Sequence, residues 1–143
     1  MAKGYSVQRT INASPQRIWG LLTEADGYAT WNPAMVSVRG QIAAGQTIEL
    51  ISVVNPKRTF LLTVSDVEPP RQMRWSDGMP LGLFRGVRTL ALRSLDDGQT
   101  EFSMHEDYSG PLAALITKAI PDLTDSFAQF ADGLKTASEA KQG

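Results

Sequence analysis

Hydrophobic and polar residues alternate with a period of two on both sides of the turn Asp96-Asp97-Gly98. That period is typical of half-buried β-strands, and a three-residue loop with glycine in the left-handed position favours an antiparallel hairpin. Closing the loop between Leu95 and Gln99 aligns apolar residues across the two strands, whereas a two-residue turn would shift the register by one and break that alignment. The aligned pairs are Leu92 with Phe102 and Leu90 with Met104.

The same register places Arg88 opposite Glu106 on the face of the hairpin that we expect to be buried. One interpretation is a solvated ion pair near the open end of a sheet, which contributes under about 1 kcal/mol. The other is a pair that lines a ligand cavity, where the Arg88 guanidinium orients the carboxylate or carbonyl group of a ligand. Burying both charges is costly unless they are paired and hydrogen-bonded, so stability alone is a poor reason to keep them there.

Alternation also predicts a first strand at Tyr5–Ile11 and four strands between Trp31 and the hairpin. Ser14-Pro15 is typical of a helix start, with serine as N-cap and proline at the first helical position. We expect a second short helix at Tyr28–Trp31 and a turn at Asn55-Pro56. The four strands contain Val36 and Val38 on one face, Ile48 and Leu50, then Phe60, Leu62 and Val64, then Met73 and Trp75.

After Gly110-Pro111 the period of the apolar residues changes from two to 3.6, the period of an α-helix. The apolar stripe runs from residue 112 to residue 134. Pro121 lies inside this stripe without breaking its phase, so we predict one long helix kinked near Ile120 rather than two separate helices. Residues 138–143 are expected to fray.

This order of elements predicts an α+β fold. It is a seven-stranded curved antiparallel sheet wrapped around a long C-terminal helix, with two short helices after the first strand. The 143 residues predict a single domain over residues 1–143, with 138–143 as its frayed tail. A curved sheet around one helix leaves space between them, which is a candidate ligand cavity of roughly a few hundred Å³.

The amino-acid composition excludes several classes of binding site. Hydrophobic residues make up 42% and charged residues 20%, as in soluble globular proteins, and the net charge is −1 without a basic cluster. We therefore expect no nucleic-acid binding and no stable membrane anchor. The absence of cysteine and the single histidine exclude thiolate and multi-histidine metal sites, and we predict no metal and no cofactor. No long apolar run or signal peptide is evident, which favours the cytoplasm.

Several local motifs occur in a characteristic order. They are Ala13-Ser14-Pro15 with Ile18-Trp19, Trp31-Asn32-Pro33, Phe84-Arg85-Gly86, Thr100-Glu101-Phe102, His105-Glu106 through Gly110, and Leu134-Lys135 with Glu139. Together they resemble the START-like (SRPBCC) helix-grip superfamily, and most closely its small bacterial polyketide cyclase/dehydrase-like members. The resemblance implies a hydrophobic ligand cavity. It does not by itself imply a reaction, because members of the superfamily vary in function.

The residues that we expect to line the cavity lie on the inward faces of the predicted sheet and helix. Trp75 is favoured as a wall because it precedes the loop at residues 77–82, which we interpret either as a lid over the cavity or as a plain connection that caps the core. His105 has the opposite parity and should face solvent. The predicted ligand-binding residues are Arg88, Glu106, Trp75, Met73, Leu90, Met104, Tyr108, Phe84, Trp31, Leu123 and Phe127.

The favoured function is binding or transport of a hydrophobic small molecule such as a lipid, fatty acid, isoprenoid or polyketide-like compound. It needs no nucleophile, metal or nucleotide. The alternative is a polyketide cyclase or dehydratase with Glu106 as general base and Arg88 or Tyr108 stabilising the oxyanion. Arg88 beside Glu106 favours the ionised, paired carboxylate, which opposes that role. A third hypothesis is an interaction module, as in one co-chaperone branch of the superfamily, but the outer strand faces carry only solvated polar residues.

Overall fold

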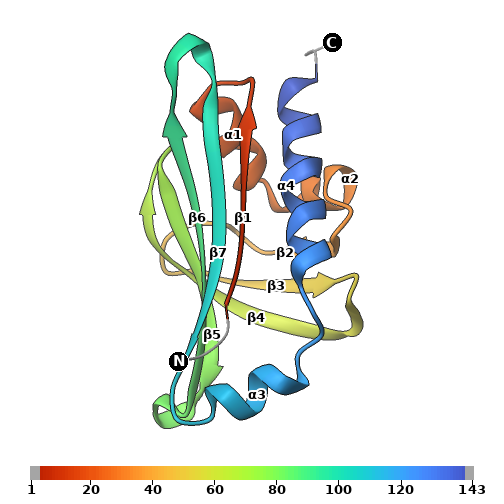
Figure 1. Ribbon diagram of the computed structural model, residues 1–143, viewed down its shortest axis with the longest axis vertical. Helices are drawn as coiled ribbons and strands as arrows, with labels where there is room; N and C mark the ends of the chain where they lie inside the picture. The colour runs from red at the N-terminus through yellow and green to blue at the C-terminus, as the bar shows by residue number, and fades with distance from the viewer. Residues whose placement is uncertain (1–3, 141–143) are drawn as a thin grey trace.

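A computed structural model describes residues 4–140 of the chain. Seven antiparallel strands form one sheet in the order β1-β7-β6-β5-β4-β3-β2, and this sheet curls around the C-terminal helix α4 (Figure 1). The arrangement confirms the predicted α+β helix-grip fold. The strands are β1 (Tyr5–Ile11), β2 (Met35–Arg39), β3 (Thr47–Ser52), β4 (Asn55–Glu68), β5 (Gln72–Met79), β6 (Phe84–Ser94) and β7 (Thr100–Ser109). The helices are α1 (Pro15–Leu22), α2 (Tyr28–Trp31), α3 (Ala113–Ala119) and α4 (Thr124–Glu139).

The β6–β7 hairpin has the predicted register. The Leu95 amide donates to the Gln99 carbonyl at 2.8 Å, which closes the loop, and Arg88 lies opposite Glu106. Within the loop, both Asp97 and Gly98 have positive φ angles, a conformation that glycine and aspartate tolerate better than most residues. Turn chemistry and strand parity together therefore determine which side chains meet across this hairpin.

The start of α1 is also as predicted. The Ser14 hydroxyl accepts a hydrogen bond from the Arg17 amide at 3.2 Å, and Pro15 is the first helical residue. A single 3₁₀ turn at Ala25–Gly27 leads into the short helix α2. Both short helices lie beside α4 (Figure 1), where they close one end of the space inside the sheet.

The C-terminal segment forms two helices, not the single kinked helix that the apolar stripe predicted. Ile120 is extended, with φ −78° and ψ 136°, because the proline that follows it disfavours helical geometry at the preceding residue. The Asp122 carboxylate then accepts a hydrogen bond from the Thr124 amide at 2.9 Å, at the start of α4. As a result α3 leaves the line of α4 and crosses the end of the sheet (Figure 1).

Two local predictions around β2 and β3 are wrong. A register shift beside Met35 turns this residue inward together with Val38, while Val36, which we expected on the same face as Val38, is exposed. The β3–β4 turn lies at residues 53–54, so Asn55-Pro56 begins β4 instead of forming the turn. Both differences come from local backbone irregularities that alternation alone does not reveal.

The fully buried core lies between the sheet and α4. Phe102 of β7 stacks on Phe130 of α4 with 6.1 Å between ring centroids. Ile18 and Leu22 of α1 close the same end of the core. No helix within residues 4–140 is long and apolar enough to cross a lipid bilayer.

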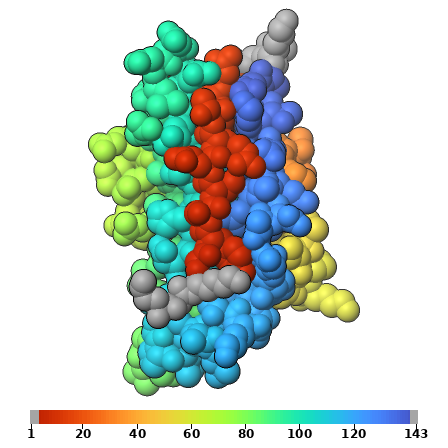
Figure 2. All heavy atoms as spheres, in the orientation of Figure 1, coloured from red at the N-terminus to blue at the C-terminus, as the bar shows by residue number. Residues whose placement is uncertain are grey.

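The last turn of α4 is fixed to the N-terminal part of the chain. Arg17 donates hydrogen bonds to the carbonyl oxygens of residues 137, 138 and 140, and the Glu139 carboxylate accepts one from the Asn12 amide. We expected fraying from Ser138 onward, but this residue is buried within the helix, and residues 141–143 lie outside the described part. Figure 2 shows β1 in red between β7 and α4, and β1 pairs with β7 along its whole length.

Candidate functional site

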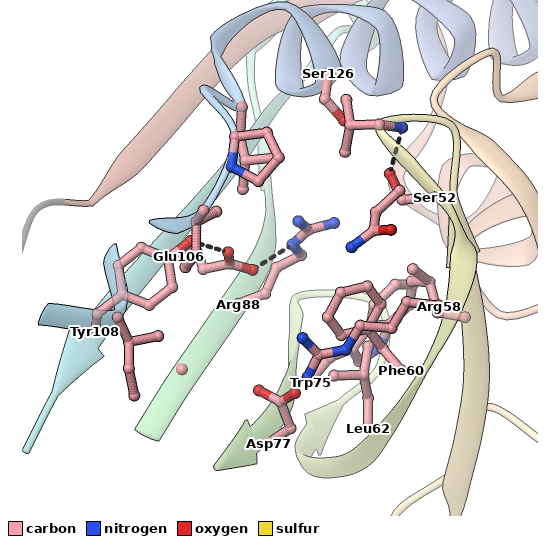
Figure 3. A pocket seen from close by; sticks show the side chains of 18 of the residues that line it. Ser52, Arg58, Phe60, Leu62, Trp75, Asp77, Arg88, Glu106, Tyr108 and Ser126 are labelled. Carbon is pink, nitrogen blue, oxygen red and sulfur yellow. Dashed lines mark hydrogen bonds and ion pairs between the residues drawn. The ribbon is translucent and has the colours of Figure 1, made fainter. Parts of the chain in front are cut away.

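A cavity of about 280 Å³ lies between the curled sheet and the junction of α3 and α4. Most of its lining is apolar and comes from β2 to β7, from α3 and from the start of α4. Figure 3 shows the polar side chains gathered around the cavity. These polar side chains are Ser52, Asn55, Arg58, Asp77, Arg88, Glu106, Tyr108 and Ser126.

Arg88, Glu106 and Tyr108 form one connected group on β6 and β7. The Arg88 Nε atom lies 3.0 Å from Glu106 Oε1, and both side chains are largely buried, at 14% and 17% exposed. The Tyr108 hydroxyl donates a hydrogen bond to the other Glu106 oxygen. Both carboxylate oxygens are thus engaged within the protein. Pairing of this kind offsets much of the cost of holding the two charges away from water.

The Arg88 guanidinium uses only its Nε atom to bind Glu106, which leaves its other N–H donors available to a ligand in the cavity. Its Cζ atom lies 4.7 Å from the centre of the Phe127 ring, a favourable cation–π distance. Its two terminal nitrogens have no hydrogen-bond partner among residues 4–140. In Figure 3 these nitrogens point away from Glu106 and toward the open centre of the cavity. A ligand oxygen placed there would complete the hydrogen bonding of this buried cation.

Asp77 of β5 and Arg58 of β4 also line the cavity, and the sequence analysis did not include them. Burial raises the pKa of Asp77, the nearby Glu106 charge raises it further, and Arg58 and Arg88 oppose this. The Arg58 guanidinium lies over the Phe60 ring at 4.4 Å. Asp77 shares the inward parity of Trp75, a signal that would have placed it in the site had its segment been assigned to a strand.

Tyr108 is suited to donate a hydrogen bond rather than to ionise. Burial raises its pKa, and the Glu106 charge and the hydrogen bond between the two side chains raise it further. The phenol therefore keeps its proton, and its ring stacks with Phe84 at 5.9 Å between centroids. Tyr108 and Phe84 together form an aromatic wall at the end of the cavity.

Six of the predicted ligand-binding residues line the cavity and five do not. Met73, Leu90 and Met104 are fully buried in the core, Phe127 contacts Arg88, and Trp31 packs on Tyr28. The strand residues in the two groups share the inward parity, and those that α4 covers lie in the packed core. The six lining residues are Trp75, Phe84, Arg88, Glu106, Tyr108 and Leu123.

The first half of the segment that we interpreted as a lid or a connection belongs to β5, which runs through Met79. Only Pro80–Gly82 forms a turn, and Leu81 on it is 96% exposed. Neither Met79 nor Leu81 is among the residues that line the cavity. As predicted, His105 faces solvent, where its Nε2 atom lies 3.3 Å from an Asp107 oxygen.

Residues 4–139 match a family model described as polyketide cyclase / dehydrase and lipid transport. The match extends over almost all of the described chain and includes every residue that lines the cavity. No curated protein matches the chain significantly.

Solved structures of low sequence identity share the fold. A START superfamily protein from Mycobacterium smegmatis has a TM-score of 0.67 at 15% identity, covering 95% of this chain and 97% of that one. The Zhui aromatase/cyclase from Streptomyces sp. R1128 has a TM-score of 0.72 at 16% identity, covering 97% and 94%. The Aha1 dimer from Colwellia psychrerythraea has a TM-score of 0.71 at 20% identity, covering 99% of both chains. At these identities the similarity shows the fold alone.

Proposed function

Because the chain belongs to the polyketide cyclase/dehydrase and lipid transport family, we propose that it binds a hydrophobic small molecule bearing a carboxylate or carbonyl group. The observation that carries this proposal is the Arg88 guanidinium, whose unpaired terminal nitrogens face a mostly apolar cavity. The ligand is a fatty acid or other lipid, an isoprenoid or a polyketide-like compound. In this arrangement Arg88 orients the polar end while the apolar walls cover the rest.

The two parts of the cavity contribute differently to binding. Each methylene group removed from water contributes roughly 0.8 kcal/mol, so the walls provide most of the affinity. A hydrogen bond to a charged group contributes about 1.5–3 kcal/mol, and it depends on the ligand carrying an acceptor. Glu106 already neutralises part of the Arg88 charge, so carbonyl oxygens as well as carboxylates suit this site.

The experiment is calorimetric titration of the protein with decanoic acid and with decanol, which has the same chain length and no charge. We expect Arg88→Leu to weaken binding of decanoic acid about tenfold or more and binding of decanol by less than about twofold. Arg85→Leu, on the outer face of the same strand, is the matched control and should change neither. Equal losses for both ligands in Arg88→Leu would remove Arg88 as the anchor.

Native mass spectrometry of gently purified protein tests the carrier function independently. A discrete additional mass of lipid size, lost on denaturation, supports the proposal and begins to identify the ligand. A bare protein that also fails to bind both decyl probes counts against it.

A cyclase or dehydratase is the second candidate, favoured by the family description and by a carboxylate beside a phenol in one cavity. With Glu106 as general base, the proton would be taken by a carboxylate oxygen that already accepts a hydrogen bond from Arg88 or Tyr108. This candidate predicts that Glu106→Gln abolishes turnover of a polyketide substrate while leaving affinity almost unchanged. Loss of affinity together with turnover would assign Glu106 to binding instead.

A further inference from the structure

Two rows of side chains cross the cavity floor from β5 to β7. In the first row Trp75, Arg88 and Glu106 lie next to one another in register. The second row consists of Asp77, Gly86 and Tyr108. Gly86 is buried and lines the cavity, so the second row has a gap where the first has a guanidinium.

Nothing in the backbone requires glycine at position 86. Its φ lies outside the left-handed region, and a Cβ atom there would lie 3.5 Å from Asp77 Oδ1 and from the Tyr108 ring, which is ordinary van der Waals contact. Gly78 on the neighbouring strand differs, because a Cβ atom there would collide with the Phe84 carbonyl oxygen. Glycine inside a strand is destabilising relative to alanine, so the effect of Gly86 is to leave room inside the cavity.

The walls of this gap determine what fits there. On one side is the Asp77 carboxyl group, which has no hydrogen bond or ion pair with any of the residues that the structure describes. On the other side is the edge of the Tyr108 ring. Arg58 and Arg88 act electrostatically on Asp77, and Glu106 acts on it with the opposite sign, so two guanidinium groups face two carboxyl groups and the gap favours neither sign of ligand charge. A neutral donor such as a hydroxyl group is the chemistry that remains.

We propose that the gap over Gly86 is a second polar subsite, which takes a hydroxyl group of the ligand and receives its hydrogen bond on Asp77. The proposal rests on the proposed function and narrows it. Arg88 holds an acceptor oxygen in one row and Asp77 holds a donor in the next, and alternate residues of a strand are separated by about 7 Å. The preferred ligand is therefore a hydroxylated amphiphile rather than a plain fatty acid.

The test compares decanoic acid with a series of monohydroxydecanoic acids that differ in the position of the hydroxyl group. Calorimetry gives a preference ratio, the dissociation constant of decanoic acid divided by that of the best hydroxy acid. We expect a ratio above about three in the unmodified protein, because an unpaired buried hydroxyl group would instead weaken binding. Asp77→Leu and Gly86→Val should each lower the ratio about tenfold, with decanoic acid still bound.

Controls separate the subsite from general damage to the cavity. Ala91→Val adds volume to the outer face of the same strand and should leave the ratio unchanged. Asp77→Asn keeps an acceptor oxygen and should retain a higher ratio than Asp77→Leu, which also shows that the fold survives a change at this position. A ratio that is equal in the unmodified protein and in Asp77→Leu overturns the subsite.

The outcomes also distinguish this proposal from the one on which it rests. If decanoic acid binds through Arg88 but no hydroxy acid binds more tightly, the subsite is wrong and the proposed function stands. If neither decanoic acid nor any hydroxy acid binds to the unmodified protein, the proposed function itself fails.

Discussion

The β6–β7 hairpin faces a packed half and a cavity half of the same interior. In the packed half, which contains the pairs Leu92–Phe102 and Leu90–Met104, α4 lies against the sheet and its aromatic side chains fill the space. In the cavity half, which contains the pairs Arg88–Glu106 and Gly86–Tyr108, the cover comes from α3 and the junction before α4. The strand pairing is continuous across both halves. The cavity thus begins at the N-terminal end of α4, and polar side chains occupy the inward positions there.

The largest effect is expected in the packed half. Phe102→Ala should lower the free energy of unfolding by about 3–5 kcal/mol, because the ring is fully buried against Phe130. Phe84→Ala in the cavity half should lower it by less than about 2 kcal/mol, because that ring is half-buried and borders existing space. Urea denaturation measures both. Equal losses would mean that the two halves are packed alike.

The effects of substituting Arg88 and Glu106 on the free energy of unfolding should be strongly coupled. Glu106→Leu leaves a buried guanidinium without its partner and should cost about 1–3 kcal/mol of unfolding free energy. The double variant Arg88→Leu/Glu106→Leu should regain most of this loss, because two apolar side chains replace two charges. A double-mutant cycle by urea denaturation measures the coupling. Additive losses would indicate that the pair behaves as a solvated surface pair.

Asp77 should give a smaller effect that depends on pH. Burial raises its pKa from 3.8, so the folded protein holds this proton more tightly than the unfolded chain does. Ionisation of Asp77 therefore lowers stability as the pH rises from 3.8 through the folded value. Asp77→Asn should accordingly raise the free energy of unfolding at neutral pH and change it little below pH 3.8. Asp96→Asn, in the exposed hairpin turn, serves as the control in the same denaturation series.

The smallest effect is expected at the gap itself. Gly86→Ala should raise the free energy of unfolding by about 0.5–1 kcal/mol, because alanine is less costly than glycine inside a strand and its Cβ atom fits. Thermal unfolding of the ligand-free protein measures the change. A loss of stability would show that the space over Gly86 is not free, and it would weaken the case for the subsite.

The sequence predicted how the strands pair in the cavity half, but not how the helices are arranged over them. The hairpin register follows from a short loop and strand parity, which are local properties, and it placed Arg88 opposite Glu106. The division of the C-terminal segment into α3 and α4 did not follow, because the apolar stripe keeps its phase across Pro121. Proline permits either a kink or a break, and the surrounding packing decides between them.

The same limit explains which predicted residues line the cavity. Met73 and Trp75 share a strand face, as do Leu90 and Arg88, yet one of each pair is in the packed core and the other borders the cavity. Strand parity predicts which face of the sheet a residue lies on, but whether that residue is packed or borders the cavity depends on where α4 begins. Arg58 shares the parity of Phe60 and Leu62, which also line the cavity, and it was missed because the strand was predicted to begin only after a turn at Asn55-Pro56.

The hydrogen bonds that join the last turn of α4 to Arg17 and Asn12 determine how late in synthesis the fold can be completed. These contacts join residues 120 to 127 positions apart, and β1 pairs with β7 across most of the sequence. A chain emerging from the ribosome cannot complete them until its last helical turn is synthesised. Folds dominated by such distant contacts complete slowly, within milliseconds to seconds. Until β1 pairs with β7, the β7 edge is open to strands of other chains, so the incompletely folded protein is most prone to aggregate before that pairing forms.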